Sequence, residues 1–161
     1  PFLANATGDL TGQAGDIQTN LKQWAAQNGL SLTDQQLQAY VSAATFNKQS
    51  IDDIKADLRK SYLAGMFPAW ADKIEAGYDP STLFAPYLKS AQDTLETMVG
   101  FDDPLMKRIT QAVGPDGKPR AVPLYEAERM MRQDPRWQKT DNAYKTYAGV
   151  AQGILRTFGF A

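Results

Sequence analysis

The closing stretch of the chain most constrains its fold, because its apolar residues recur at the spacing of an α-helix. From about residue 143 they fall on one face when each residue is turned by about 100°, and Lys145, Gln152 and Arg156 fall on the opposite face. The apolar set consists of Ala143, Tyr144, Tyr147, Ala151, Ile154, Leu155 and Phe158. Asp134-Pro135 is placed to begin a helix and Gly159 to end it. This predicts an amphipathic helix packed on the core of its own chain.

Two glycines, Gly149 and Gly153, lie within the same helix but away from the apolar face. Each costs a helix interior about 1 kcal/mol relative to alanine. A four-residue spacing of small residues lets a second backbone come close. The pair therefore predicts either a second packing surface, used by something other than the chain's own core, or a solvated face that tolerates glycine. In the first case, leucine at both positions is expected to disrupt assembly and leave helicity intact.

Residues that favour the start or the end of a helix recur along the rest of the chain. No stretch shows the sustained alternation of apolar and polar residues that is typical of a β-strand. Thr33 with Gln36 has the pattern of a capping box, and Ser50 precedes two aspartates that favour a first helical turn. Asp-Pro helix starts recur at residues 79–80, 103–104 and 134–135. The prediction is an all-α fold of about seven or eight short to medium helices in antiparallel hairpins. At most a tiny β-ribbon is expected near residues 112–122, around the turn sequence GPDGKP.

A chain of 161 residues is long enough for one domain with a substantial core or for two small helical lobes. Residues 1–15 are small and polar and are expected to form a flexible lead-in. The expected organisation is an N-terminal helical lobe at 16–64 and a C-terminal helical domain at 65–161, with one continuous domain over 16–161 as the alternative. The start at Pro1 rather than methionine is expected of a processed product or of part of a longer polypeptide.

The chain contains no histidine and no cysteine, which removes Ser-His-Asp and Cys-His catalysis and the usual zinc ligands. Carboxylate chemistry remains, and three acidic pairs are available for it. Neighbours in sequence do not give the separation that a pair of catalytic carboxylates needs, and three of these aspartates stand at expected helix starts. We therefore expect no enzyme, no cofactor and no metal site. The pairs are Asp52 with Asp53, Asp102 with Asp103, and Glu126 with Glu128.

The net charge of −1 gives no global reason to expect a nucleic acid or an anionic membrane as the partner. A modest basic patch is explained as well by a solvated surface as by a nucleic-acid contact; it comprises Lys107, Arg108, Lys118 and Arg120. No window approaches the roughly 18–20 apolar residues of a membrane-spanning helix.

The three tryptophans, Trp24, Trp70 and Trp137, are spread along the chain and are predicted to anchor the core. Arg136-Trp137 has an alternative role, since tryptophan and arginine dominate interface hot spots. The candidate interaction residues are Gly149, Gly153, Arg136, Trp137 and Phe160.

Several segments occur in an order that carries a family resemblance. They are FPAWADKIEAG at 67–77, Asp79-Pro80, Tyr87-Leu88, PLYE at 123–126 and RQDPRW at 132–137, followed by the closing helix. In this order they resemble a segment near the C-termini of tailed-bacteriophage virion proteins of the internal, ejection or tape-measure type. The resemblance covers about residues 58–160 and carries no catalytic residues.

The resemblance implies a non-enzymatic structural or assembly module that docks on other virion proteins, such as the portal, tail or internal core, through helix faces. It allows a homo-oligomer, and it implies location in the phage particle, or otherwise in the cytoplasm of the infected bacterium. The main alternative is an accessory targeting domain of a peptidoglycan-degrading virion enzyme. A third hypothesis is a membrane-active ejection segment that uses the apolar face at 143–158.

Overall fold

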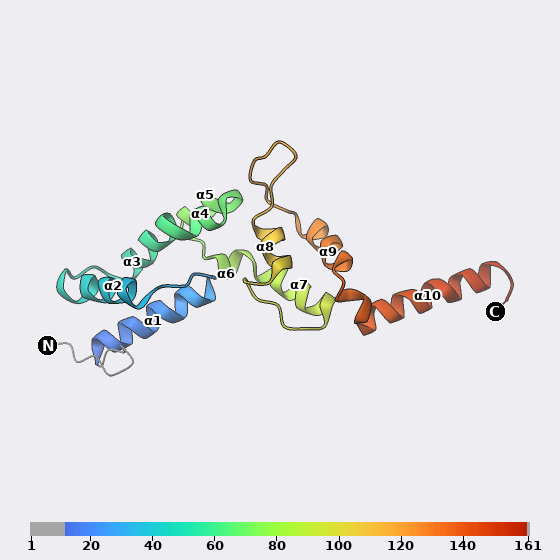
Figure 1. Cartoon of the computed structure of the whole chain (residues 1–161), viewed down its shortest axis with the longest axis horizontal. Coiled ribbons are helices and arrows are strands. Elements are labelled where there is room, and N and C mark those ends of the chain that lie inside the picture. Colours follow the sequence, from blue (N-terminus) through green and yellow to red (C-terminus); the bar gives the residue numbers. More distant parts are fainter. Residues whose placement is uncertain (1–11, 161) are drawn as a thin grey trace. The chain divides into compact units, whose positions relative to one another are not determined.

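The computed structural model describes residues 12–160, which form helices joined by short connections (Figure 1). These residues contain ten α-helical segments, α1 to α10, and no β-strand, so the all-α prediction is confirmed, with a few more helical segments than the seven or eight expected. One isolated antiparallel bridge joins Val113 to Pro119, within the region expected to hold a tiny ribbon. The lead-in expected at 1–15 lies mostly outside the described residues, and the first helix already begins at Gln13.

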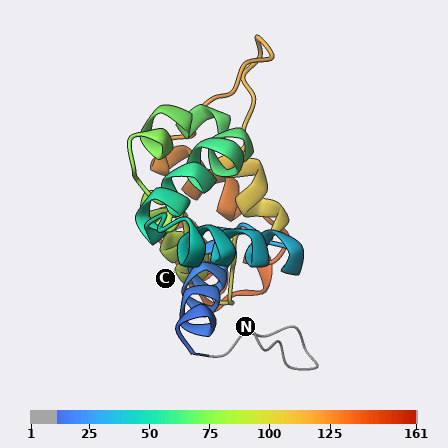
Figure 2. The same cartoon turned by 90° about the vertical axis from the view of Figure 1, so that its left-hand side faces the viewer.

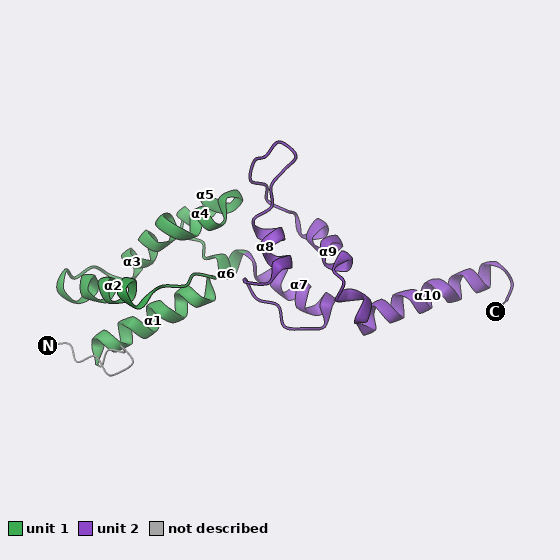
Figure 3. Ribbon diagram, viewed as in Figure 1, with its two compact units in different colours: residues 1–83 green, residues 84–161 purple. Residues whose placement is uncertain are grey.

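The chain divides into two compact units, residues 1–83 and residues 84–161 (Figure 3). The sequence had placed the division after residue 64. Residues 65–83 belong to unit 1 because Asp79 bonds back to it, accepting from Trp24 Nε1 at 3.1 Å and Arg59 Nε at 2.8 Å. The backbone N–H of Ser81 also donates to Asn28 Oδ1 at 2.9 Å. The contacts from Trp24 and Asn28 join segments more than fifty residues apart, so local helix signals in the sequence do not indicate them.

Unit 1 forms its helices largely where the capping residues predict them. The Thr33–Gln36 capping box is present, Ser50 caps the next helix, and Asn28-Gly29 ends the first one. The fully buried leucines and isoleucines of these helices form the unit's core. The elements are α1 (Gln13–Gln27), α2 (Asp34–Phe46), α3 (Ile51–Leu58), the π-helical turn η1 (Arg59–Leu63), α4 (Ala64–Met66), the 3₁₀ turn η2 (Pro68–Trp70), α5 (Ala71–Glu75) and α6 (Pro80–Leu83).

Unit 2 is built on helices α7 and α9, which pack against each other. Phe84 is fully buried at the break before α7, with its ring edge-to-face to Tyr87 and Phe101. The Tyr87 hydroxyl donates to the backbone oxygen of Val122 at 2.8 Å, which fixes the chain just before α9. The elements are α7 (Ala85–Leu95), α8 (Pro104–Thr110), α9 (Leu124–Gln133), the 3₁₀ turn η3 (Trp137–Lys139) and α10 (Asp141–Thr157).

The loop between α8 and α9 projects beyond the helices that it joins (Figures 1 and 2). Its turn closes through Gly117, whose φ of 78° is a left-handed conformation that suits glycine. Arg120, at the base of this loop, forms two 2.7 Å bonds with the carboxylate of Glu126 in the first turn of α9.

The prediction that Asp134-Pro135 begins the long closing helix is wrong. Asp134 instead accepts from the backbone N–H of Arg136, in a tight turn that leads into η3. The helix begins at Asp141, and Thr140 is its N-cap, accepting from the N–H of Ala143 at 3.1 Å. An Asp-Pro pair favours the start of a helix but does not determine its length. Here it is followed by only a single 3₁₀ turn.

The prediction that the apolar face of the closing helix packs on its own core is also wrong. Ala143 is the one residue of α10 that is buried, and the large side chains after it are all exposed. Within unit 2, α10 leads away from α7, α8 and α9 and contacts mainly η3 (Figure 3). The helical spacing was read correctly, but spacing alone does not say what covers a face.

Candidate functional site

The base of α10 is fixed to the C-terminal end of α7 by one carboxylate. Glu96 follows α7 in a left-handed conformation, with φ of 51°. Its two oxygens accept from the backbone N–H groups of Asp141 and Asn142 at 2.9 and 3.0 Å. The Asn142 side chain also donates to the backbone oxygen of Asp93 at 3.1 Å. Because a helix N-terminus carries unsatisfied N–H groups and partial positive charge, an anion there both satisfies and orients it.

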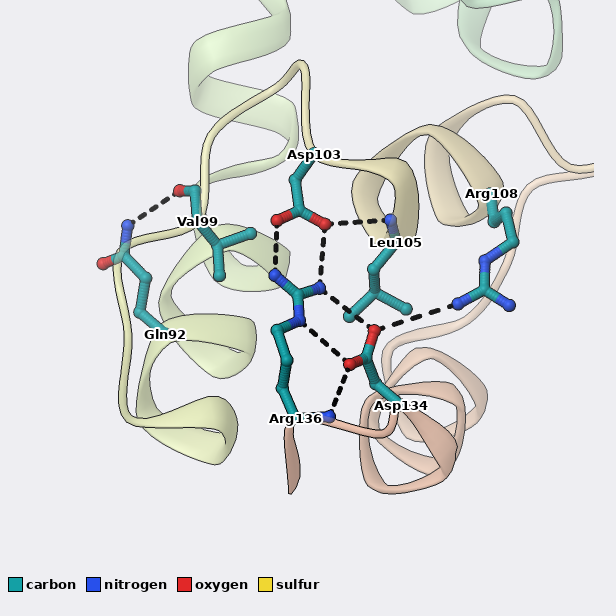
Figure 4. Close-up of polar contacts among 7 residues, drawn as sticks. All are labelled: Gln92, Val99, Asp103, Leu105, Arg108, Asp134 and Arg136. Atoms are coloured by element: carbon teal, nitrogen blue, oxygen red, sulfur yellow. Dashed lines mark hydrogen bonds and ion pairs between the residues drawn. The ribbon is translucent and has the colours of Figure 1, made fainter. Parts of the chain in front are cut away.

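The turn before α10 is held by an arginine shared between two aspartates (Figure 4). Arg136 forms a bidentate pair with Asp103, Nη1 to Oδ2 at 2.7 Å and Nη2 to Oδ1 at 2.9 Å. It also donates to Asp134, from Nε at 2.9 Å and from Nη2 at 3.0 Å. Asp103 in turn caps α8 by accepting from the N–H of Leu105 at 2.9 Å. One side chain therefore links the start of α8, the end of α9 and the approach to α10.

The electrostatics of this cluster favour the charged forms of all three groups. Hydrogen bonds from Arg136 hold the pKa of Asp103 and of Asp134 below their ordinary value, and burial only partly opposes this. The same bonds, with Asp103 first and Asp134 second, raise the pKa of the guanidinium. A general acid needs the opposite shift, a raised carboxyl pKa. The cluster therefore serves cohesion, and Arg136 is mostly engaged within its own unit rather than offered to a partner.

Trp137 is half-buried and lies beside the first turns of α10. Its ring is edge-on to that of Tyr147, with centroids 5.7 Å apart. It also lines an open groove of about 730 Å³ whose other walls come from α7, α9 and α10. The remaining lining residues are polar or charged: Asp93, Thr94, Arg132, Asn142, Lys145 and Thr146. The core role predicted for the tryptophans is thus confirmed for Trp24, which is 7% exposed, but not for Trp137.

From Tyr144 onward, α10 presents an apolar face that the rest of unit 2 leaves uncovered, apart from the contact between Trp137 and Tyr147. We call it the α10 stripe. Its large side chains are between 45% and 74% exposed, and two alanines separate those of the first turns from those of the last. The stripe consists of Tyr144, Tyr147, Ala148, Ala151, Ile154, Leu155 and Phe158. Contiguous exposed apolar surface of this kind marks an interaction site or an aggregation liability in a soluble protein.

The helix ends in a Schellman motif that brings Phe160 back toward it. The N–H of Phe160 donates to the oxygen of Leu155 at 2.9 Å, and that of Gly159 to Arg156 at 3.2 Å. Gly159 has the left-handed φ of 76° that this motif requires, which confirms it as the stop. Phe160 is 80% exposed and extends the apolar surface past the last turn.

Gly149 and Gly153 lie on the other side of α10, exposed and with open space around them. A Cβ built on either glycine meets no heavy atom within 4 Å. No second backbone within the described part of unit 2 approaches them, so both interpretations of the pair stay open. The structure adds that alanine fits both positions sterically.

The other candidates from the sequence are dispersed. Asp52 and Asp53 are exposed at the start of α3, where Asp53 bonds with the cap Ser50. Of the basic patch, Arg120 is paired with Glu126, and Arg108 lies 4.0 Å from Asp134. Among residues 12–160, no three acidic side chains are grouped so that they could hold a metal ion. None of the described helices is long and apolar enough to cross a membrane.

Comparisons with known proteins identify no family. The chain matches no protein-family model, and neither the curated proteins nor the solved structures include a match. The resemblance to phage virion proteins therefore stays a prediction from sequence motifs.

Two functional anchors were missed in the sequence, Glu96 and Asp79. Glu96 bonds with residues 45 and 46 positions later, so no local pattern marks it. Asp79 was interpreted only as a helix-start residue, whereas its carboxylate is held by Trp24 and Arg59.

Proposed function

We propose that this chain is a non-enzymatic structural module of a tailed-phage particle, which assembles with other virion proteins through α10. The observation that carries the docking role is the α10 stripe, an exposed apolar face on a helix whose base is fixed. A partner that covers the stripe gains the burial of large apolar side chains, at roughly 25 cal/mol per Å². Because Glu96 and Arg136 already orient the helix, little additional ordering is needed on binding.

The assignment to a phage particle is supported by the motif order at 67–77, 79–80, 87–88, 123–126 and 132–137. Portal, tail and internal-core proteins are the expected partners, and the particle is the expected location. A non-catalytic role is supported by the chemistry of the Arg136 cluster, whose carboxylates are held ionised by an arginine rather than poised for proton transfer.

Two measurements test this proposal. Peptides of this chain should be found by mass spectrometry in purified particles of the phage that encodes it; their absence from particles would refute the location. Phage carrying Ile154→Glu should incorporate less of the chain than phage carrying Gln152→Glu. Both variants add one negative charge to an exposed position of α10, but only Ile154 belongs to the stripe. Equal incorporation would refute the docking role.

A second candidate function is supported by the groove beside Trp137. An aromatic wall among amide, carboxylate and cationic groups has the mixed character of small-molecule sites, and a polar glycan fragment fits that chemistry. The chain would then be an accessory targeting domain of a peptidoglycan-degrading virion enzyme. Sedimentation with insoluble peptidoglycan tests this: binding should be lost in Trp137→Ala and retained in Trp70→Ala, whose tryptophan is also half-buried but lies in unit 1. No binding by the unmodified chain would exclude it.

A further inference from the structure

We propose that the stripe's partner is α10 of a second copy of this chain, in an antiparallel pair whose twofold axis passes beside Ala151. This inference rests on the proposed function of α10 as a docking helix and names its partner. The pair is isologous, so each copy uses the same surface and the contact closes on itself.

The spacing of the stripe supports this arrangement because it is symmetric about Ala151. Its members lie three, four and seven positions on either side of that residue. In an antiparallel pair with its axis at Ala151, each side chain therefore faces another member of the stripe. The opposed residues, first copy to second, are Tyr144 with Phe158, Tyr147 with Leu155, and Ala148 with Ile154.

Side-chain size favours the antiparallel over the parallel pair. The two small residues of the stripe, Ala148 and Ala151, both precede its large C-terminal residues in the sequence. In an antiparallel pair Ala148 faces Ile154, so small packs against large and the helices approach closely only at the axis. A parallel pair in register stacks Ala148 on Ala148 and Ala151 on Ala151, which leaves two successive layers underfilled.

The exposed area is of the size that a stable dimer needs. An aromatic side chain contributes about 150–250 Å². The stripe's aromatic side chains, Tyr144, Tyr147 and Phe158, are 56–74% exposed and offer on the order of 400 Å² per copy, and Phe160, which follows the last turn outside the stripe, adds about 150 Å². The exposed parts of Ile154 and Leu155 raise this toward the roughly 800 Å² per partner of a standard interface. Such an area suits pairing between two helices of this length.

The charges are compatible with pairing. The stripe contains no charged residue, and Lys145 and Arg156 lie on the opposite face, where they stay in water. Antiparallel helices also align their dipoles favourably. Because α10 leads away from the rest of unit 2, this arrangement places α7–α9 of the two copies at opposite ends of the helix pair (Figure 3). Gly149 and Gly153 are outside the pair, which assigns them to the solvated face.

Mass measurement of the 161-residue chain tests the pairing. Light scattering coupled to gel filtration should give twice the 17.8 kDa of one chain at about 100 µM, and dissociation on dilution. Ile154→Glu should raise the dissociation constant at least about a hundredfold, because it buries an unpaired charge. The matched variant Gln152→Glu, and Gly149→Ala with Gly153→Ala, should leave it within about threefold. A monomeric wild-type chain, or a dimer insensitive to Ile154→Glu, overturns the inference.

Cysteine cross-linking tests the orientation, since the chain has no cysteine of its own. Ala151→Cys lies at the axis and should form an inter-chain disulfide on mild oxidation. Ala148→Cys should not, because six residues of helix, about 9 Å, then separate the two positions along the axis, beyond the reach of a disulfide. Cross-linking of both variants would indicate a parallel pair, and cross-linking of neither would exclude this interface.

The two proposals fail differently. If the chain is monomeric but Ile154→Glu still abolishes incorporation into particles, only self-pairing is refuted and the stripe docks on another virion protein. If incorporation is also unaffected by Ile154→Glu, the docking role itself is refuted.

Discussion

Replacement of Arg136 by alanine should be the most damaging single change on the surface of unit 2. It removes four hydrogen bonds of 2.7–3.0 Å and leaves two neighbouring carboxylates without their shared cation. The side chains of Asp103 and Asp134 are only 12% and 9% exposed, whereas that of Arg136 is 39% exposed. Breaking a buried ion pair costs about 3–5 kcal/mol and breaking an exposed pair about 0–1. For this intermediate case we expect a loss of about 2–3 kcal/mol in the free energy of unfolding of unit 2.

The assay should report on unit 2 alone. Trp137 is the tryptophan of unit 2, and Trp24 and Trp70 are those of unit 1, so indole N–H signals in NMR separate the two units during a urea titration. Arg108→Ala is the matched control, because it removes the same charge from a side chain that is 62% exposed. The Nη2 atom of Arg108 lies 4.0 Å from Oδ2 of Asp134, so it makes a much weaker contact than Arg136 does. The control should cost less than about 1 kcal/mol. Equal losses in the two variants would refute the assigned role of Arg136.

The loss of stability in Arg136→Ala should depend on pH, and the pKa shifts of Asp103 and Asp134 determine its direction. The folded-state pKa of Asp103 and of Asp134 lies below the ordinary value of 3.8. Their contribution to stability is therefore present above about pH 4–5 and is lost as pH falls through 3.8 and below. The stability difference between wild type and Arg136→Ala should shrink between pH 7 and pH 3, while that for Arg108→Ala changes little. A difference that does not depend on pH would contradict the electrostatic explanation.

Three further changes test other anchors. Glu96→Gln keeps the shape but removes the anion at the start of α10, so amide hydrogen exchange in its first turn should accelerate severalfold, with the last turn of α10 as the internal control. Asp79→Asn leaves Arg59 without its carboxylate and should cost unit 1 about 1–2 kcal/mol, seen in its own tryptophan signals and not in those of unit 2. Tyr87→Phe leaves the buried carbonyl of Val122 without its donor and should cost unit 2 about 1–2 kcal/mol; a neutral result would show that water replaces the hydroxyl.

The three Asp-Pro pairs show how far local signals carry. At Asp103 the prediction succeeds fully, since Pro104 begins α8 and the carboxylate caps it. At Asp79 the helix begins at Pro80 but lasts a single turn, and the carboxylate bonds with Trp24 and Arg59 instead. At Asp134 the same dipeptide makes a turn around Arg136. The local preference is identical in all three places, so the dipeptide alone does not determine the length of the helix that follows it.

The fold class and most helix boundaries were predictable because they depend on residues close together in the sequence. The domain boundary and the site were not predictable, because they depend on contacts between distant residues. Capping residues such as Thr33 and Ser50 act within three positions, so their effect can be read from the sequence. The Arg136 pair with Asp103 spans 33 positions, and the Glu96 anchor spans 45. Such contacts depend on how helices pack, and a charged residue carries no local mark of a partner so far along the chain.

The α10 stripe shows what helical periodicity measures. A period of 3.6 in apolar residues shows that these residues share one face of a helix, and it does not indicate which molecule, if any, covers that face. A core helix and an assembly helix therefore share one pattern, and the surroundings distinguish them. In this chain Ala143 is buried within unit 2, and the stripe continues for several turns beyond it. A helix that is held at its base by Glu96, and whose apolar face the rest of unit 2 leaves mostly uncovered, fits the docking role proposed for α10.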